Sequence, residues 1–316
     1  MNNFTQNKNS SITAFMAVML FLYASVNAQQ RDSTTFSQPT DHYQPKRGRL
    51  IAIGVGGAYV ASMSVLYSVW YKDYPQSKFH FFNDVKEWNQ MDKFGHVGSS
   101  YYLGRWSTEM VRWTGTDKRK SAIIGTGMGY LFQTTIEVLD GFSSQWGFSV
   151  GDVIANTTGS ALFLSQELLW NEQRITYKFS YHESGLAQYR PNILGSTLPE
   201  RILKDYNGQT YWLSANIYSF LPKESKFPKW LNIALGYGAD GMIGAESNDV
   251  SYKGIAVPPY ERVRQFYLAA DVDLTKIKTK SKTLKTLFQL FGFVKFPSPT
   301  FEYRSNGRSL FHGFYF

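Results

Sequence analysis

The spacing of apolar residues changes once along this chain, near residue 173, and this change most constrains the fold. Before it, apolar residues recur every three to four positions, as on helices, and after it they alternate every second position, as on strands. This order predicts an α+β protein in which a four-helix bundle with a polar interior precedes an antiparallel β region. We expect a helical domain over residues 49–172 and the β region over residues 173–316.

The first 28 residues have the layout of a secretory signal peptide. A polar stretch precedes the apolar run Ile12–Tyr23, and Val26-Asn27-Ala28 ends in small residues of the kind that signal peptidase recognises. An uncleaved anchor helix is the alternative, although the run is shorter than the ~20 residues of a membrane span. Residues 29–48 are rich in Gln, Ser, Thr, Asp and Pro, which predicts a linker. The sequence therefore predicts an exported protein.

Composition excludes several classes of protein. Charged residues are 18% and aromatic residues 17% of the 316 residues, which excludes a disordered chain. The chain has no cysteine, which excludes disulfide scaffolds, iron–sulfur clusters, thiol catalysis and a lipid anchor on an N-terminal cysteine. The net charge is +9, but an exported chain without a nucleic-acid-binding motif is not expected to bind nucleic acid. No Gly-rich phosphate loop is present, and we expect no cofactor.

Four helices are expected in the first half. Leu50–Tyr71 has no charged residue and is long enough to cross a hydrocarbon core or to form the central helix of a soluble bundle. Its glycines at 54, 56 and 57 predict a packing contact. The other helices are expected over residues 91–114, 119–141 and 150–170, with Asp117 capping the second of these and Gly125, Gly127 and Gly129 allowing neighbouring backbones to approach it.

Each of these three helices carries a polar stripe on one face. The stripes are Asp92, His96 and Ser99, then Gln133, Glu137 and Asp140, then Asp152, Asn156 and Gly159. Residues four and seven positions apart lie on the same side of a helix. Because an unpaired buried charge costs several kcal/mol, carboxylates in otherwise apolar helices should face one another. We therefore expect a shared polar interior.

These residues resemble two families. Asp92-Lys93-x-x-His96, Glu137 and Asp152-x-x-x-Asn156-x-x-Gly159 resemble the signature of VanZ-like four-helix membrane proteins. The stretch from Met91 to Trp170 is more similar to the YfiM-type predicted periplasmic lipoproteins, a family of unknown function. The chain lacks the lipobox cysteine, so lipidation does not carry over. The resemblance implies an envelope protein and supplies no reaction.

Six strands are expected in the second half. Their apolar and polar residues alternate within Ile175–Tyr181, Tyr211–Phe220, Leu231–Gly238, Phe266–Leu274, Thr300–Arg304 and Ser309–Phe316. Several are close to the ~10 residues of a membrane-spanning strand, and the chain ends in Phe316, which resembles outer-membrane β-barrel proteins. Any half-exposed antiparallel sheet alternates in the same way. Since a closed barrel needs about eight strands, either two more lie around 40–48 and 185–205, giving six to eight, or the sheet is open.

A basic run precedes an apolar stretch late in the chain. The lysines are Lys276, Lys278, Lys280, Lys282 and Lys285, and the apolar residues lie between Leu284 and Phe293. Together they predict an interfacial amphipathic helix in which Lys278, Lys280 and Lys282 bind anionic lipid. A solvated loop followed by a packed helix is the alternative.

The polar stripes supply the candidate site residues. In an enzyme, His96 would be a general base oriented by Glu137 or Asp152, with Asp92 beside it, acting on a lipid or glycan. No metal site is assigned, although His96, Glu137 and Asp152 are the ligands that a divalent ion would use. Three further residues, Lys93, Asp140 and Asn156, are candidates for binding. The alternative is structural: these groups pair with one another and fix the register of the helices.

The function that we expect is that of an outer-membrane-associated envelope protein that binds lipid, glycan or an envelope protein partner. The amphipathic strands and the lack of a catalytic motif favour this interpretation over an enzyme. The alternative is a membrane lipid- or glycan-modifying enzyme that uses His96 and its neighbouring carboxylates. A wholly soluble periplasmic protein is the third possibility. We expect the protein at the outer membrane or on the periplasmic face of the envelope of a Gram-negative bacterium.

Overall fold

The structure is a computed structural model that describes residues 40, 42–72, 75–248, 250–252 and 255–315. The signal peptide expected over residues 1–28, most of the expected linker and Phe316 lie outside the described residues. The chain divides into two compact units. The first takes residues up to Asp84 together with Ser99–Glu172, and the second takes Val85–Gly98 together with Gln173–Phe316.

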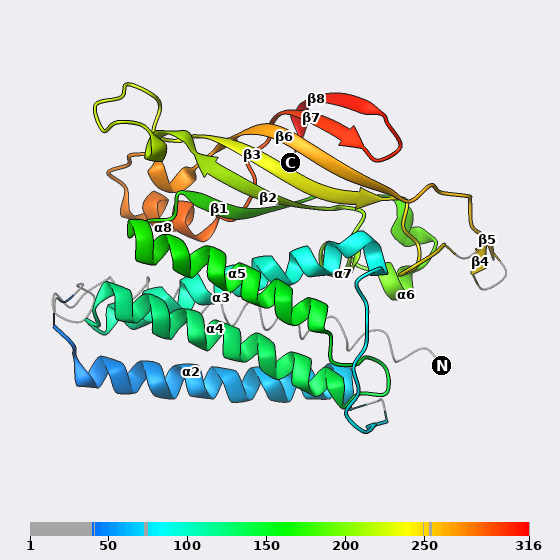
Figure 1. Cartoon of the computed structure of the whole chain (residues 1–316), viewed down its shortest axis with the longest axis horizontal. Helices are drawn as coiled ribbons and strands as arrows, with labels where there is room; N and C mark the ends of the chain where they lie inside the picture. The colour runs from blue at the N-terminus through cyan, green and yellow to red at the C-terminus, as the bar shows by residue number, and fades with distance from the viewer. Residues whose placement is uncertain (1–39, 41, 73–74, 249, 253–254, 316) are drawn as a thin grey trace. The chain divides into compact units, whose positions relative to one another are not determined.

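Long helices make up the first unit. They are α2 (Pro45–Leu66), which a π-helical turn continues over Tyr67–Tyr71, the later part of α3 (Met91–Trp113), α4 (Lys118–Gly141) and α5 (Val150–Trp170) (Figure 1). The carboxylate of Asp117 accepts hydrogen bonds from the backbone N–H groups of Arg119 and Lys120, which confirms it as the cap of α4. α2 begins at Pro45, inside the segment expected as a linker, because proline is favoured in the first turn of a helix.

Glycines allow α4 to pack closely on α3. A Cβ atom on Gly125 would lie 2.3 Å from the backbone nitrogen of Thr108, and one on Gly129 would lie 2.8 Å from that of Gly104. The packing contact expected for the α2 glycines is wrong, since a Cβ atom on Gly54, Gly56 or Gly57 would meet nothing within 4 Å. These positions therefore face open space.

Several apolar side chains of the helical unit are exposed, while its interior combines polar residues with large side chains such as Tyr101, Phe132 and Phe163. Ile124 and Leu131 of α4 are exposed, as are Ile154 and Leu169 of α5. The buried polar residues of these two helices include Ser121, Thr126, Gln133, Glu137, Asp152, Asn156, Ser160, Gln166 and Glu167. The polar interior expected from the three stripes is therefore present. Within the described residues, α2 is the one helix long and apolar enough to cross a membrane.

A six-stranded antiparallel sheet makes up most of the second unit. In spatial order its strands are β1 (Ile175–Tyr181), β2 (Gln209–Asn216), β3 (Leu231–Asp240), β6 (Val263–Val272), β7 (Ser298–Arg304) and β8 (Ser309–Tyr315) (Figure 1). The second unit also contains the short hairpin β4 (Ser251–Tyr252) and β5 (Ile255–Ala256), and the helices α6 (Pro191–Leu194), α7 (Leu198–Lys204) and α8 (Lys282–Leu290). The α+β class is thus confirmed.

The sheet is open rather than a closed barrel. The extra strands considered around 40–48 and 185–205 are wrong, because the first range enters α2 and the second forms short helices. The strand expected over Tyr211–Phe220 ends at Asn216, whose side-chain oxygen accepts from the N–H of Ser219 and turns the chain into a 3₁₀ helix. Curvature still brings distant strands together, since the hydroxyls of Thr210 on β2 and Tyr315 on β8 lie 3.2 Å apart.

The sheet exposes apolar side chains on one face and buries polar side chains on the other, which is the opposite of the usual arrangement. On β6, Gln265 and Asp271 are 4% and 1% exposed, whereas Phe266 and Leu268 are each 46% exposed. Strands β2, β3 and β7 follow this pattern, with exposed Leu213, Ile233, Leu235, Phe301 and Tyr303 opposing buried Ser214, Asn232, Ala234, Thr300 and Glu302. The buried face therefore combines polar residues with Trp212 and Tyr267, and the opposite face exposes apolar residues where the start of α3 does not cover it, as it does at Tyr237.

Candidate functional site

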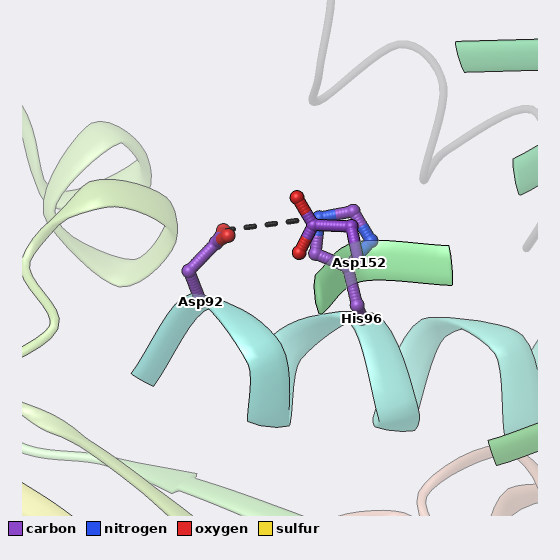
Figure 2. Close-up of side chains that lie close together, drawn as sticks. All are labelled: Asp92, His96 and Asp152. Carbon is purple, nitrogen blue, oxygen red and sulfur yellow. Dashed lines mark ion pairs between the residues drawn. The ribbon is translucent and has the colours of Figure 1, made fainter. Parts of the chain in front are cut away.

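The start of α3 holds the expected Asp92 and His96, both in the second unit. One helical turn apart, they project from the same side of α3, and Nε2 of His96 lies 3.8 Å from Oδ1 of Asp92 (Figure 2). Two more donors reach the same carboxylate: Nζ of Lys93 donates to Oδ2 over 3.2 Å, and the Tyr206 hydroxyl donates to Oδ1 over 2.9 Å. The carboxylate of Asp92 is thus the centre of a small polar cluster, in which it accepts hydrogen bonds from Lys93 and Tyr206 and lies beside His96.

The charge state of Asp92 follows from this setting. Burial acts to raise the pKa of the carboxyl, but the charges of His96 and Lys93 and the hydrogen bond from Tyr206 outweigh it, and the pKa is lowered. Asp92 is therefore ionised at neutral pH. Both oxygens of Asp92 already accept hydrogen bonds. The ligands that the second unit offers a divalent ion here are therefore the imidazole of His96 and a carboxylate whose oxygens are already hydrogen-bonded.

A strained turn leads into this cluster. Trp88, Asn89 and Gln90 have φ values of 48°, 50° and 66°, a left-handed conformation that residues other than glycine seldom adopt. Hydrogen bonds from the rest of the unit hold the turn: the Tyr237 hydroxyl donates to the Asn89 carbonyl over 2.5 Å, and Arg264 donates to the Gln90 side chain over 3.0 Å. Such strain persists only where its surroundings enforce it, and it concentrates at functional sites.

The other polar stripes meet inside the helical unit. The side-chain oxygen of Asn156 accepts from the hydroxyl of Ser100 over 3.0 Å and from the amide of Gln133 over 3.2 Å, which joins α3, α4 and α5. Glu137 and Asp152 are also buried here, at 1% and 5% exposure. Figure 2 labels Asp152 as well, which lies on α5 in the first unit. These contacts fit the structural alternative, in which polar groups fix the helix register.

Asp140 has a separate partner at the end of α4. The hydroxyl of Tyr71 donates to Oδ1 of Asp140 over 2.5 Å. Burial raises the pKa of Tyr71, and the negative charges of Asp140 and Glu137 raise it further, so the phenol stays protonated and remains a donor. Asp140 therefore ties the turn after α2 to α4.

The expected basic run lies beside α8. Lys278 and Lys280 are exposed, and Lys282 is the first residue of the helix, which Ser281 caps by accepting the N–H of Leu284. On α8 the apolar residues Leu284 and Leu287 remain 44% and 40% exposed. The amphipathic helix expected from the sequence is therefore present, with much of its apolar surface uncovered.

The sequence reasoning missed an ionic cluster inside the sheet. Asp271 of β6 pairs with Lys178 of β1, with Nζ 2.7 Å from Oδ2, and with Lys295, with Nζ 3.8 Å from Oδ1. All three side chains are at most 1% exposed. Lys178 and Asp271 stand at polar positions of alternating strands, which was an available signal, whereas nothing in the sequence marked Lys295.

A second missed pair lies on β7 and β8. Nε2 of His312 lies 2.6 Å from Oε2 of Glu302, and the other oxygen of this carboxylate accepts from Gln265 and Arg304 over 2.9 and 2.6 Å. Glu302 is 1% exposed. Its place between apolar neighbours was the available signal. The partner depends on the pairing of β7 with β8, in which His312 lies opposite Thr300, two residues from Glu302.

Comparison with protein families matches residues 80–166 to the family described as "Predicted periplasmic lipoprotein (DUF2279)". This range contains the strained turn, the Asp92–His96 pair and the polar stripes of α4 and α5. No curated protein and no solved structure matches the chain. The similarity expected from Met91–Trp170 is thereby confirmed, and the resemblance to VanZ-like proteins stays a prediction. Over residues 80–166 this chain is similar to the family of predicted periplasmic lipoproteins, which supports an exported protein of the cell envelope.

Proposed function

We propose that this protein is a non-enzymatic component of the outer membrane of a Gram-negative bacterium, held there by the apolar outer face of its sheet. One observation carries the proposal: along β2, β3, β6 and β7 the sheet buries most of its polar side chains and exposes a band of apolar ones. In an antiparallel sheet of a water-soluble protein the apolar face packs on the core and the polar face meets water. The reverse arrangement is the rule for membrane β-structure, whose solvent is hydrocarbon.

The length of the strands supports the same proposal. β3 and β6 have 10 residues each, and at about 3.3 Å per residue each extends ~33 Å. A strand of about 9–11 tilted residues is what a hydrocarbon core of ~30 Å requires. Leu235 and Leu268 pair in the middle of these strands, at 62% and 46% exposure. In water, this uncovered band would favour aggregation.

The basic run supplies a contact for the membrane surface. Lys278 and Lys280 are exposed just before α8, whose exposed leucines can enter the boundary between headgroups and acyl chains. Each lysine near an anionic surface is worth about 1 kcal/mol. The anionic groups are the phosphates of outer-membrane lipid in this proposal.

Membrane fractionation with a matched pair of substitutions tests the proposal. Leu235→Arg with Leu268→Arg places two cations in the middle of the apolar band, each at a cost of about 2–4 kcal/mol in lipid. Val250→Arg is the control, because Val250 is 85% exposed and lies outside the strands of the sheet. We expect the wild type and the control to stay in the outer-membrane fraction after carbonate washing and the double variant to be lost from it. Release of the wild type by carbonate alone would contradict the proposal.

A second candidate is an enzyme that acts on a lipid or glycan through His96. The strained turn at Trp88–Gln90 favours it, since it directly precedes a carboxylate–imidazole pair. His96→Ala separates the candidates: loss of a cellular phenotype at normal abundance of folded protein supports catalysis. An unchanged phenotype supports the non-enzymatic role. Tyr206→Phe, which removes only a hydrogen bond to Asp92, is the conservative control.

A further inference from the structure

A polar pocket of about 370 Å³ lies at one end of the sheet, entirely within the second unit. Three segments surround it: the loop after β1 at Ser184–Gln188, the ends of β3 and β6 at Asp240 and Val263, and the turn between β7 and β8. The volume falls in the range of sites for small ligands. We propose that this pocket binds a saccharide unit of an envelope glycan.

The charged groups of the lining balance one another. Arg304 and Arg308 provide two positive charges, and Asp240 and Glu261 provide two negative charges. An anionic ligand such as phosphate would be repelled by both carboxylates, and an acyl chain would displace water from all four charged groups. A neutral ligand that both donates and accepts hydrogen bonds avoids both costs. Each hydroxyl of a sugar has this property.

The polar atoms retain capacity for such a ligand. Asn306 donates to Oε2 of Glu261 over 2.9 Å, and a guanidinium nitrogen of Arg304 lies 3.6 Å from Oδ2 of Asp240. Oδ1 of Asp240 also accepts from the backbone N–H of Gly241 over 2.7 Å, whereas the contact with Asn306 uses one oxygen of Glu261. Arg308 is exposed, and its guanidinium has no hydrogen-bond partner among the residues that the structure describes. Planar amide, carboxylate and guanidinium groups can each bridge two hydroxyls of one sugar ring.

An aromatic ring completes the lining. Tyr260 is 36% exposed, and its hydroxyl donates to that of Tyr189 over 3.1 Å, with the two ring centres 5.7 Å apart. The hydroxyl contact fixes the ring while a face remains accessible. The C–H groups on one side of a sugar ring form an apolar surface that packs on such a face.

The pocket is rigid enough for recognition. The backbone N–H of Arg304 donates to the carbonyl of Arg308 over 2.8 Å, and that of Ser305 donates to Arg264 over 2.9 Å. Gly307 has a φ of 85°, which allows the tight turn. The Nε group of Arg304 donates to the buried Glu302, so its guanidinium is held in place before a ligand arrives. Preorganisation of this kind lowers the entropic cost of binding.

The position of the pocket suits a glycan rather than a membrane lipid. It lies where β3 ends and β6 begins, whereas α8 and the basic run follow the other end of β6. The two features are therefore separated by the length of the apolar band, ~33 Å for 10 residues. With the band in the membrane, the pocket would lie on the aqueous side opposite to α8.

Calorimetric titration of the full chain in detergent tests the proposal. The probes are neutral oligosaccharides of glucose, galactose and N-acetylglucosamine, with inorganic phosphate as the competing ligand. We expect at least one oligosaccharide to bind, Tyr260→Ala and Arg308→Ala each to weaken it tenfold or more, and phosphate not to compete. Lys226→Ala, an exposed cation outside the pocket, should bind as the wild type does.

Three outcomes would overturn the proposal: no binding of any of these probes, equal binding by the wild type and both pocket variants, or displacement by phosphate. Circular dichroism of each variant establishes that a loss of binding is not a loss of fold. Arg308→Ala is the substitution least able to disturb the fold, because the guanidinium has no hydrogen-bond partner within the described part of the chain. The result is independent of membrane attachment, because retention in the outer-membrane fraction is measured without a glycan.

Discussion

The ammonium of Lys178 lies 2.7 Å from Oδ2 of Asp271, between strands that are not neighbours in the sheet, and both side chains are at most 1% exposed. Lys295 approaches the other oxygen of the same carboxylate. Asp271 also accepts from the hydroxyl of Ser214 over 2.6 Å. One carboxylate therefore organises cations from two further segments of the second unit.

Removing this carboxylate should destabilise the sheet strongly. Asp271→Asn leaves two buried ammonium groups without their counter-charge, and breaking a buried pair in this way costs about 3–5 kcal/mol. Urea unfolding of the detergent-solubilised protein measures the loss. Glu224→Gln, at an exposed position in a loop, is the control and should unfold as the wild type does. Equal stability of the two variants would show that the ionic cluster does not hold the fold.

The stability of the protein should rise between pH 8 and pH 10. Burial lowers the pKa of Lys295 to about 8, more than Asp271 raises it, and the charge of Lys178 lowers it further. Between this value and the ordinary pKa of about 10.5, the unfolded chain binds more protons than the native state. The free energy of unfolding therefore gains up to ~1.4 kcal/mol per pH unit from this group. Lys295→Met should remove that gain in urea titrations at pH 7, 8, 9 and 10.

The Asp92 cluster should lose stability in acid. Because the pKa of Asp92 is lowered in the folded state, its contribution is complete above the ordinary pKa of about 3.8 and is lost as the pH falls through the folded value. Asp92→Asn should be less stable than the wild type at pH 7 and nearly equal to it at the lowest pH at which both fold. Thermal unfolding from pH 7 downward checks this, and a constant difference between the two proteins would contradict it.

Two glycines two positions apart on α4 should respond in opposite ways. Gly125→Ala places a Cβ atom 2.3 Å from the backbone of Thr108, and such overpacking costs about 1–3 kcal/mol. Gly127→Ala meets nothing within 4 Å and should stabilise the helix by up to ~1 kcal/mol, because alanine is the better helix former. Thermal unfolding of both variants measures the difference. Equal effects would show that the close packing of α3 and α4 is not required.

Much of the fold was predictable because periodicity is a local property. Helical periodicity with a polar stripe predicted α3, α4 and α5 to within one residue at each end. Alternation identified all six strands of the sheet and which residues share a face. Strand ends were less predictable: Asn216 ends β2 through a side-chain hydrogen bond that competes with the ladder, in a stretch whose alternation continues.

The candidate sites were predictable only in part. The i, i+4 spacing placed Asp92 beside His96, and helical stripes gathered Gln133 and Asn156. The third partner of Asp92 is the hydroxyl of Tyr206, which is more than a hundred residues away in the chain. No pattern in the sequence around Tyr206 indicates this contact. The same holds for the strained turn at Trp88–Gln90, which is enforced by side chains of β3 and β6.

By itself, the sequence determined which residues form helices, which form strands, and which side of each is apolar, since these follow from contacts between residues at most four positions apart. The tertiary structure decided that the apolar side of the sheet is its exposed side. It also decided that Lys178, Asp271 and Lys295 share one buried site, and that loops from three places enclose a pocket. The physical reason is that burial and ion pairing depend on which distant segments meet, and alternation alone is the same whichever face is covered.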